Sequence, residues 1–171
     1  MREFANWLAG TGLNQTIAGN LWMIPTIQSV HIVAIGVLVG ALFMVDMRIL
    51  GVVGKDQSLV VTSRRFAPWI WGAIAVLLTS GVLLIFGEPE RELLSFSFWA
   101  KMILVVIGTA IVAAFQIHLR GREAEWETTL VAAPLTKVFA IASIGIWIAI
   151  MVLGRFIAWD AQIWGALSPQ L

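Results

Sequence analysis

Four long stretches without Asp, Glu, Lys or Arg dominate the sequence. The first separates Glu3 from Asp46, and the others cover residues 66–87, 102–119 and 138–154. A helix needs about 20 residues to cross a hydrocarbon core of roughly 30 Å. Each stretch is close to that length or longer, so the sequence predicts four membrane-spanning helices, near residues 22–45, 68–86, 98–117 and 135–156.

These stretches are expected to be helical because, in lipid, every backbone amide must find its partner inside its own segment or in a closed barrel. They lack the alternation of apolar and polar residues that marks barrel strands. A composition of 60% hydrophobic and 12% charged residues excludes a soluble domain. The predicted fold class is all-α, with an up-down-up-down four-helix bundle that forms a single transmembrane domain over residues 1–171.

Prolines and the first residues refine this prediction. Pro68 and Pro134 are expected to open the second and fourth helices, where a missing amide donor does least harm. Phe4, Trp7 and Leu8 share one face of a short N-terminal helix. We expect that helix to lie in the membrane interface.

Basic residues beside the helix ends predict the orientation. The connections between the first and second and between the third and fourth helices hold Arg48, Lys55, Arg64, Arg65, Arg120, Arg122 and Lys137. The other side holds only Arg2, Arg91, Lys101 and Arg155. Because basic residues are preferentially retained in the cytoplasm, we expect a multi-pass protein of the bacterial inner membrane with both termini in the periplasm.

Composition also excludes several partners and cofactors. The formal net charge is +1 and no tract is rich in Lys or Arg, so nothing indicates nucleic-acid binding. The absence of cysteine rules out disulfides, thiolate metal sites and iron–sulfur ligation by this chain. The expected partners are the lipid bilayer and, within it, further copies of the chain or a larger membrane complex.

His31 is the leading functional candidate, because polar residues are costly inside a membrane and usually face a bundle interior. Gln28 lies three residues before it on the same helical face and belongs to the same candidate site. Counted from Pro25, His31 lies about 9 Å into the membrane. We expect a neutral imidazole there, which either hydrogen-bonds to a neighbouring polar group or coordinates a metal.

An antiparallel bundle brings further residues to the depth of His31: Thr79 and Ser80 of the second helix, Lys101 and Met102 of the third, and Met151 and Arg155 of the fourth. A b-type haem would use this set, with His31 as an axial ligand and Met102 or Met151 as the second. Lys101 and Arg155 would pair with the haem propionates. The same residues also fit a structural role, since methionines fill gaps in cores and long basic side chains extend to head groups.

His118 lies at the other end of the third helix, about 20 Å from His31 along the membrane normal. The two histidines therefore cannot bind one iron, and His118 is the weaker candidate for a metal ligand. Its predicted place is an interfacial cluster with Gln116, Arg120, Asp46 and Arg48, which Arg65 can join. An ion pair between Asp46 and an arginine would lower the cost of a carboxylate near lipid.

One segment carries a family resemblance. Residues 22–31, WMIPTIQSVH, continue through Gly36 and Gly40 to DMRILG at residues 46–51. The whole chain resembles a family of uncharacterised bacterial four-helix membrane proteins. It is more distantly similar to the haem-dependent membrane protoporphyrinogen oxidases and to the copper-resistance membrane domain, which also have a histidine early in a first helix. The oxidase pattern of His, Arg and Lys is matched by His31, Arg48 and Lys101, and this resemblance implies haem b binding at His31.

Three functional hypotheses follow. The first is a small membrane cytochrome of the b type, which binds haem for electron transfer or for oxidation of a tetrapyrrole or quinol; whether such a protein is an enzyme stays open. The second is a haem-free accessory subunit that packs into a larger membrane complex through Gly36 and Gly40. The third is a carrier for a small ion or lipid.

Overall fold

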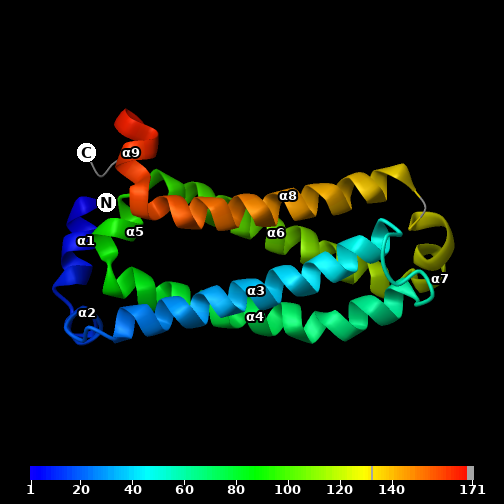
Figure 1. Cartoon of the computed structure of the whole chain (residues 1–171), viewed down its shortest axis with the longest axis horizontal. Helices are drawn as coiled ribbons and strands as arrows, with labels where there is room; N and C mark the ends of the chain where they lie inside the picture. The colour runs from blue at the N-terminus through cyan, green and yellow to red at the C-terminus, as the bar shows by residue number, and fades with distance from the viewer. Residues whose placement is uncertain (132, 169–171) are drawn as a thin grey trace.

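Four long helices form the body of the protein in a computed structural model that describes residues 1–131 and 133–168 (Figure 1). They are α3 (Met23–Ile49), α4 (Leu59–Gly87), α6 (Phe96–Arg120) and α8 (Pro134–Phe156). Each is long and apolar enough to cross a membrane. The predicted all-α fold with a four-helix membrane core is confirmed, and the chain is a multi-pass membrane protein.

The four spans form two antiparallel pairs. α3 packs along α4 and α6 along α8, while α8 also contacts α3 (Figure 1). Their shared core is apolar and includes Leu38, Ala41, Ile70, Ala73 and Trp147. Large apolar side chains also face outward, among them Val33 and Ile103, which are 67% and 61% exposed. An outer surface of this kind suits contact with lipid.

Serine side chains set the beginning of two spans. Ser58 Oγ accepts a hydrogen bond from the Val61 amide at the start of α4, and Ser95 Oγ caps α6 in the same way. Helix α4 therefore begins at residue 59, before the predicted start at Pro68. That prediction was wrong: Pro68 lies inside α4, where its missing amide removes only one helical bond, the one to the Arg64 carbonyl in the second turn. Pro134 does open α8.

Short helices cover the end of the bundle at which α1 and α9 lie (Figure 1). They are α1 (Arg2–Ala9), α2 (Gly12–Ala18), α5 (Pro89–Leu93) and α9 (Asp160–Trp164), with the 3-10 turns Ile157–Trp159 and Gly165–Leu167. Ala5 and Leu8 of α1 are buried against α5, whereas Phe4 and Trp7 stack on each other and are exposed. The N-terminal segment is thus amphipathic, but Leu8 faces the protein and does not share the exposed face of Phe4 and Trp7.

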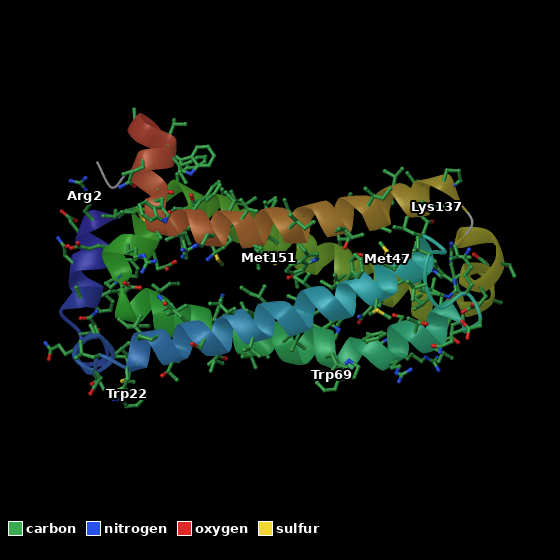
Figure 2. All side chains as sticks on the ribbon, in the orientation of Figure 1. Arg2, Trp22, Met47, Trp69, Lys137 and Met151 are labelled. Atoms are coloured by element: carbon green, nitrogen blue, oxygen red, sulfur yellow. The ribbon has the colours of Figure 1, made fainter. Side chains whose placement is uncertain are left out.

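The opposite end holds the connection from α3 to α4 and the short helices α7 (Glu123–Glu125) and η1 (Trp126–Leu130). Figure 2 shows Met47 and Lys137 at this end, and Arg2 and Trp22 at the other. The two ends are called below the α7 end and the α5 end. Arg64 of α4 forms an ion pair with Glu123 of α7, so the connection between α6 and α8 is held against α4.

Glycines lie both at a helix contact and on the outer surface of the bundle. A Cβ at Gly108 would lie 3.2 Å from the Trp147 ring, so this glycine permits the close contact of α6 with α8. Gly36 and Gly40 are exposed, and a Cβ on either would meet no described atom within 4 Å. These two glycines face outward and do not pack helices together inside the chain. Packing of this face on a partner subunit stays a prediction.

Candidate functional site

His31 turns toward α4. Its Nδ1 lies 2.7 Å from Ser80 Oγ, and Ser80 in turn donates its only hydroxyl proton to the Val76 carbonyl at 2.6 Å. Ser80 must therefore accept a hydrogen bond from Nδ1–H, which leaves Nε2 as the unprotonated nitrogen of the neutral ring. A carbonyl, carboxylate or hydroxyl partner at one ring nitrogen is the usual way in which a metal-binding histidine is oriented.

Lys101 of α6 lies within electrostatic reach of His31. Its Nζ is 5.4 Å from the centre of the Phe98 ring. Glu92 of α5 is its acidic neighbour: burial raises the pKa of the Glu92 carboxyl, and the positive charge of Lys101 acts in the opposite direction. Lys101 thus already has a carboxyl group beside it at the α5 end.

The other residues of the predicted haem site lie on α3, α6 and α8. Met102 packs against the apolar cluster at the α5 end, Met151 is half-buried on α8, and Arg155 is exposed. Gln28 Nε2 lies 3.4 Å from Glu88 Oε2, its acceptor. No hydrogen bond or ion pair between described residues joins Met102, Met151 or Arg155 to His31. Within the same residues, no three His, Asp or Glu side chains gather as a metal site.

Asp46 of α3 lies near the α7 end and is only 7% exposed. Its Oδ2 atom has no hydrogen-bond partner among the described residues, and the side chain of Ser143 is its polar neighbour. The expected ion pair with an arginine was wrong: no ion pair within residues 1–131 and 133–168 includes Asp46. Arg48 follows two residues later, on a different helical face, and its Nε donates to the Gln57 carbonyl.

Asp46 lines a cavity of about 480 Å³ between the four spans. Its polar lining consists of Asp46, Ser63, Gln116, His118, Thr136 and Ser143. Its apolar lining includes Leu42, Val45, Ile49, Ile70, Ile111, Val112, Phe115, Phe139 and Ala140. Neither this cavity nor the groove between α3 and α4 that Val30 and Leu83 line includes His31. We call the first space the Asp46 cavity.

Helix α6 presents nitrogen donors to the Asp46 cavity. Gln116 Oε1 accepts a hydrogen bond from Trp71 Nε1 at 2.8 Å, which fixes the orientation of the carboxamide. No bond to Gln116 Nε2 is found among the described side chains. His118 Nδ1 accepts from Trp126 Nε1 at 3.1 Å, so the neutral ring carries its proton on Nε2. The structure thus confirms that Gln116, His118 and Asp46 gather at one end of the bundle.

The exposed part of the lining of the Asp46 cavity lies on α6 and α8. Every lining residue from α3 and α4 is buried. The exposed lining residues are Ala114, His118, Leu135 and Phe139, which belong to α6 and α8. Because these side chains lie on the outer surface of two adjacent spans, a molecule dissolved in the bilayer could reach the cavity sideways.

Trp126 lines the Asp46 cavity at the α7 end, and Glu127 holds its segment in place. Trp126 is buried in the wall, and the next residue, Glu127, accepts hydrogen bonds from Ser58 Oγ and from the Leu59 and Val60 amides at the start of α4. Burial acts to raise the pKa of Glu127, but these hydrogen bonds outweigh it and hold the pKa below its ordinary value. The carboxylate therefore anchors the Trp126 segment to α4.

Fold and cavity together define a class: a four-span membrane protein with a buried carboxyl group, one oxygen of which lacks a partner among the described residues, beside a largely apolar cavity between the spans. The chain belongs to a family of unknown function (DUF6644), which matches residues 9–160. The predicted membership of an uncharacterised family is confirmed. No curated protein and no solved structure matches the chain. Similarity to the protoporphyrinogen oxidases and the copper-resistance domain stays a prediction.

Proposed function

We propose that this protein binds a small lipid-soluble molecule in the Asp46 cavity and that Asp46 holds the polar part of that molecule. The supporting observation is the Asp46 carboxyl group, which is buried on the cavity wall with one oxygen lacking a partner among the described residues. An isolated polar group in such surroundings costs free energy unless it finds a hydrogen-bond partner. A bound molecule would supply that partner.

The distribution of the lining supports an amphipathic ligand. Asp46, His118 and Thr136 lie within a few residues of helix ends, at the level of the membrane interface. Leu42 and Ile111 line the cavity nearer the middle of the bilayer. A polar head group would therefore meet the polar lining, and its apolar part would extend inward. The volume falls within the range of about 300–1,000 Å³ that is usual for small-molecule sites.

Filling the cavity tests this proposal. Ala140 lines the cavity on α8, and Ala142 is exposed on the same helix. Both single variants, Ala140→Phe and Ala142→Phe, and the parent protein are purified in nanodiscs, incubated with a bacterial total lipid extract, washed and analysed by mass spectrometry. We expect the parent and Ala142→Phe to retain the same lipid-soluble molecule, and Ala140→Phe to retain at least tenfold less.

Equal retention by the three proteins, or retention of bulk phospholipid alone by the parent, would contradict the proposal. Size-exclusion chromatography and circular dichroism establish that each variant is folded before the comparison. If Ala140→Phe fails this check, Ser143→Leu fills the same space from the next turn of α8.

We also propose haem b binding at His31 as a second candidate function. It is supported by the hydrogen bond from Nδ1–H to Ser80, which leaves Nε2 to coordinate iron. Lys101 would pair with a haem propionate near the α5 end. The haem would supply one-electron chemistry. This site is separate from the Asp46 cavity, since residues 31 and 46 are about 22 Å apart along α3.

A reduced-minus-oxidised spectrum tests the haem proposal. The protein is expressed with ample haem and purified as the parent, His31→Ala and His118→Ala. We expect a Soret and an α band in the parent and in His118→Ala, and their loss in His31→Ala. A parent protein without either band, or a spectrum unchanged by His31→Ala, would remove the proposal.

A further inference from the structure

We infer that the molecule bound in the Asp46 cavity is of the quinone and hydroquinone class. This inference rests on the proposed function and adds the chemistry of the head group. It depends on which hydrogen-bonding groups face the cavity and from which helices they come.

The α6 side of the cavity offers nitrogen donors. Gln116 Oε1 is occupied by Trp71, so the carboxamide presents its Nε2 protons. His118 Nδ1 is occupied by Trp126, so the neutral ring presents Nε2–H. Donors of this kind bind the oxygen of a carbonyl group. The α6 wall therefore selects a ligand that carries an acceptor oxygen.

The α3 and α8 side offers a carboxyl and a hydroxyl group. Asp46 is contributed by α3 and its neighbour Ser143 by α8. A protonated carboxyl group donates to a quinone oxygen, and a carboxylate accepts from a hydroquinone hydroxyl, so Asp46 fits either form. A ring with two oxygens on opposite sides can thus bond to α6 and to Asp46 at once, and its apolar tail can leave between α6 and α8.

Other lipid-soluble ligands match these walls less well. A fatty acid would bring a second carboxylate beside Asp46. A lipophilic amine would pair with Asp46 but leave the donors of Gln116 and His118 without an acceptor. It would also approach Arg120 and Lys137, which lie within two residues of the lining residues His118 and Thr136. A neutral ring with two oxygens brings no second carboxylate, gives the α6 donors an acceptor and places no positive charge near the two basic residues.

Partition between nanodiscs tests the inference. Protein-containing and empty nanodiscs of synthetic phosphatidylcholine are equilibrated with decylubiquinone or a short-chain menaquinone, and the quinone in each is measured by chromatography. The variants are Gln116→Glu, which keeps an acceptor for Trp71 but removes the Nε2 donor, Asp46→Leu and Asp46→Asn. Gln15→Leu at the α5 end is the control, because Gln15 is exposed on α2, and dodecylamine is the competing cation.

We expect the parent and the control to enrich at least one quinone, and Gln116→Glu and Asp46→Leu to lower its affinity at least tenfold. Asp46→Asn should lower the affinity less than threefold, because an amide both donates and accepts hydrogen bonds. The inference is overturned if no quinone is enriched, if dodecylamine displaces it, or if Asp46→Asn is as damaging as Asp46→Leu. If the quinone inference fails, the proposed function still holds provided that Ala140→Phe abolishes retention of another lipid-soluble molecule. If Ala140→Phe retains that molecule, the proposed function fails as well.

Discussion

The Asp160→Ala variant is expected to lose about 3 kcal/mol of stability, because several buried donors would lose their acceptor together. Asp160 is 0% exposed. Its Oδ1 accepts from Ser95 Oγ and the Ser97 amide at 2.9 and 2.8 Å, and its Oδ2 accepts from the Phe96 amide and Ser168 Oγ at 2.9 and 2.6 Å. One carboxylate after α8 therefore caps the N-terminus of α6, where a negative charge is also favoured by the helix dipole.

Thermal and denaturant unfolding of the purified protein in detergent would measure this loss. Asp56→Ala is the matched control, because Asp56 is an exposed acid in the connection between α3 and α4. It should change stability by less than about 0.5 kcal/mol. Asp160→Asn should be intermediate, since it keeps one acceptor oxygen but turns an amide toward other donors. Equal stability of Asp160→Ala and Asp56→Ala would contradict the assignment of Asp160 as a cap.

Replacing Asp46 with leucine is expected to act in the opposite direction. In the ligand-free protein, Asp46→Leu should raise stability by about 1–2 kcal/mol, because an apolar side chain replaces a buried carboxyl group that lacks a hydrogen bond at Oδ2 among the described residues. The adjacent cavity of about 480 Å³ accommodates the two methyl groups, which are slightly larger than the oxygens they replace. The same variant should lose the bound molecule, so stability and binding would change in opposite senses.

The measurement compares unfolding of delipidated parent, Asp46→Leu and Asp46→Asn, each before and after addition of lipid extract. Only the parent and Asp46→Asn should gain stability on addition, since a ligand stabilises the folded state that binds it. Asp56→Leu controls for the added hydrophobicity at an exposed position. If Asp46→Leu is less stable than the ligand-free parent, the carboxyl group has a stabilising role within the protein, and the proposed site loses its supporting observation.

The fold followed from hydrophobicity because each span must be long, apolar and hydrogen-bonded within itself. The limits of the helices were harder to predict. The apolar stretch before Glu88 starts after Arg65, yet α4 begins at Leu59 because Ser58 and Glu127 cap its first turn. Where a helix extends beyond the hydrocarbon core, caps of this kind determine the residue at which it begins. This cap was hard to predict because Glu127 is distant in sequence from the residues that it binds.

The site was less predictable because sequence position fixes depth along a helix but not which neighbour a side chain meets. Lys101 was expected at the level of His31, and the structure brings its charge within reach of that ring. Ser80 was also expected at this level and is the hydrogen-bond partner of His31, whereas the two methionines make no hydrogen bond to the ring in the described part of the chain. Asp46 was singled out, but the cavity beside it depends on side chains from all four spans. One signal in the sequence indicated that Asp46 would form no ion pair within its own helix: no basic residue lies four positions before or after it.

The placement of α1 and α9 at the same end of the bundle has a consequence for experiments in cells (Figure 1). Reporter fusions at the two chain ends should give the same readout, because an even number of crossings separates them. The fusions would also leave Trp126 and the cavity lining beside His118 unobstructed on the far side. One fluorescence or phosphatase reporter would therefore establish which compartment lies next to the Asp46 cavity without altering the residues around it.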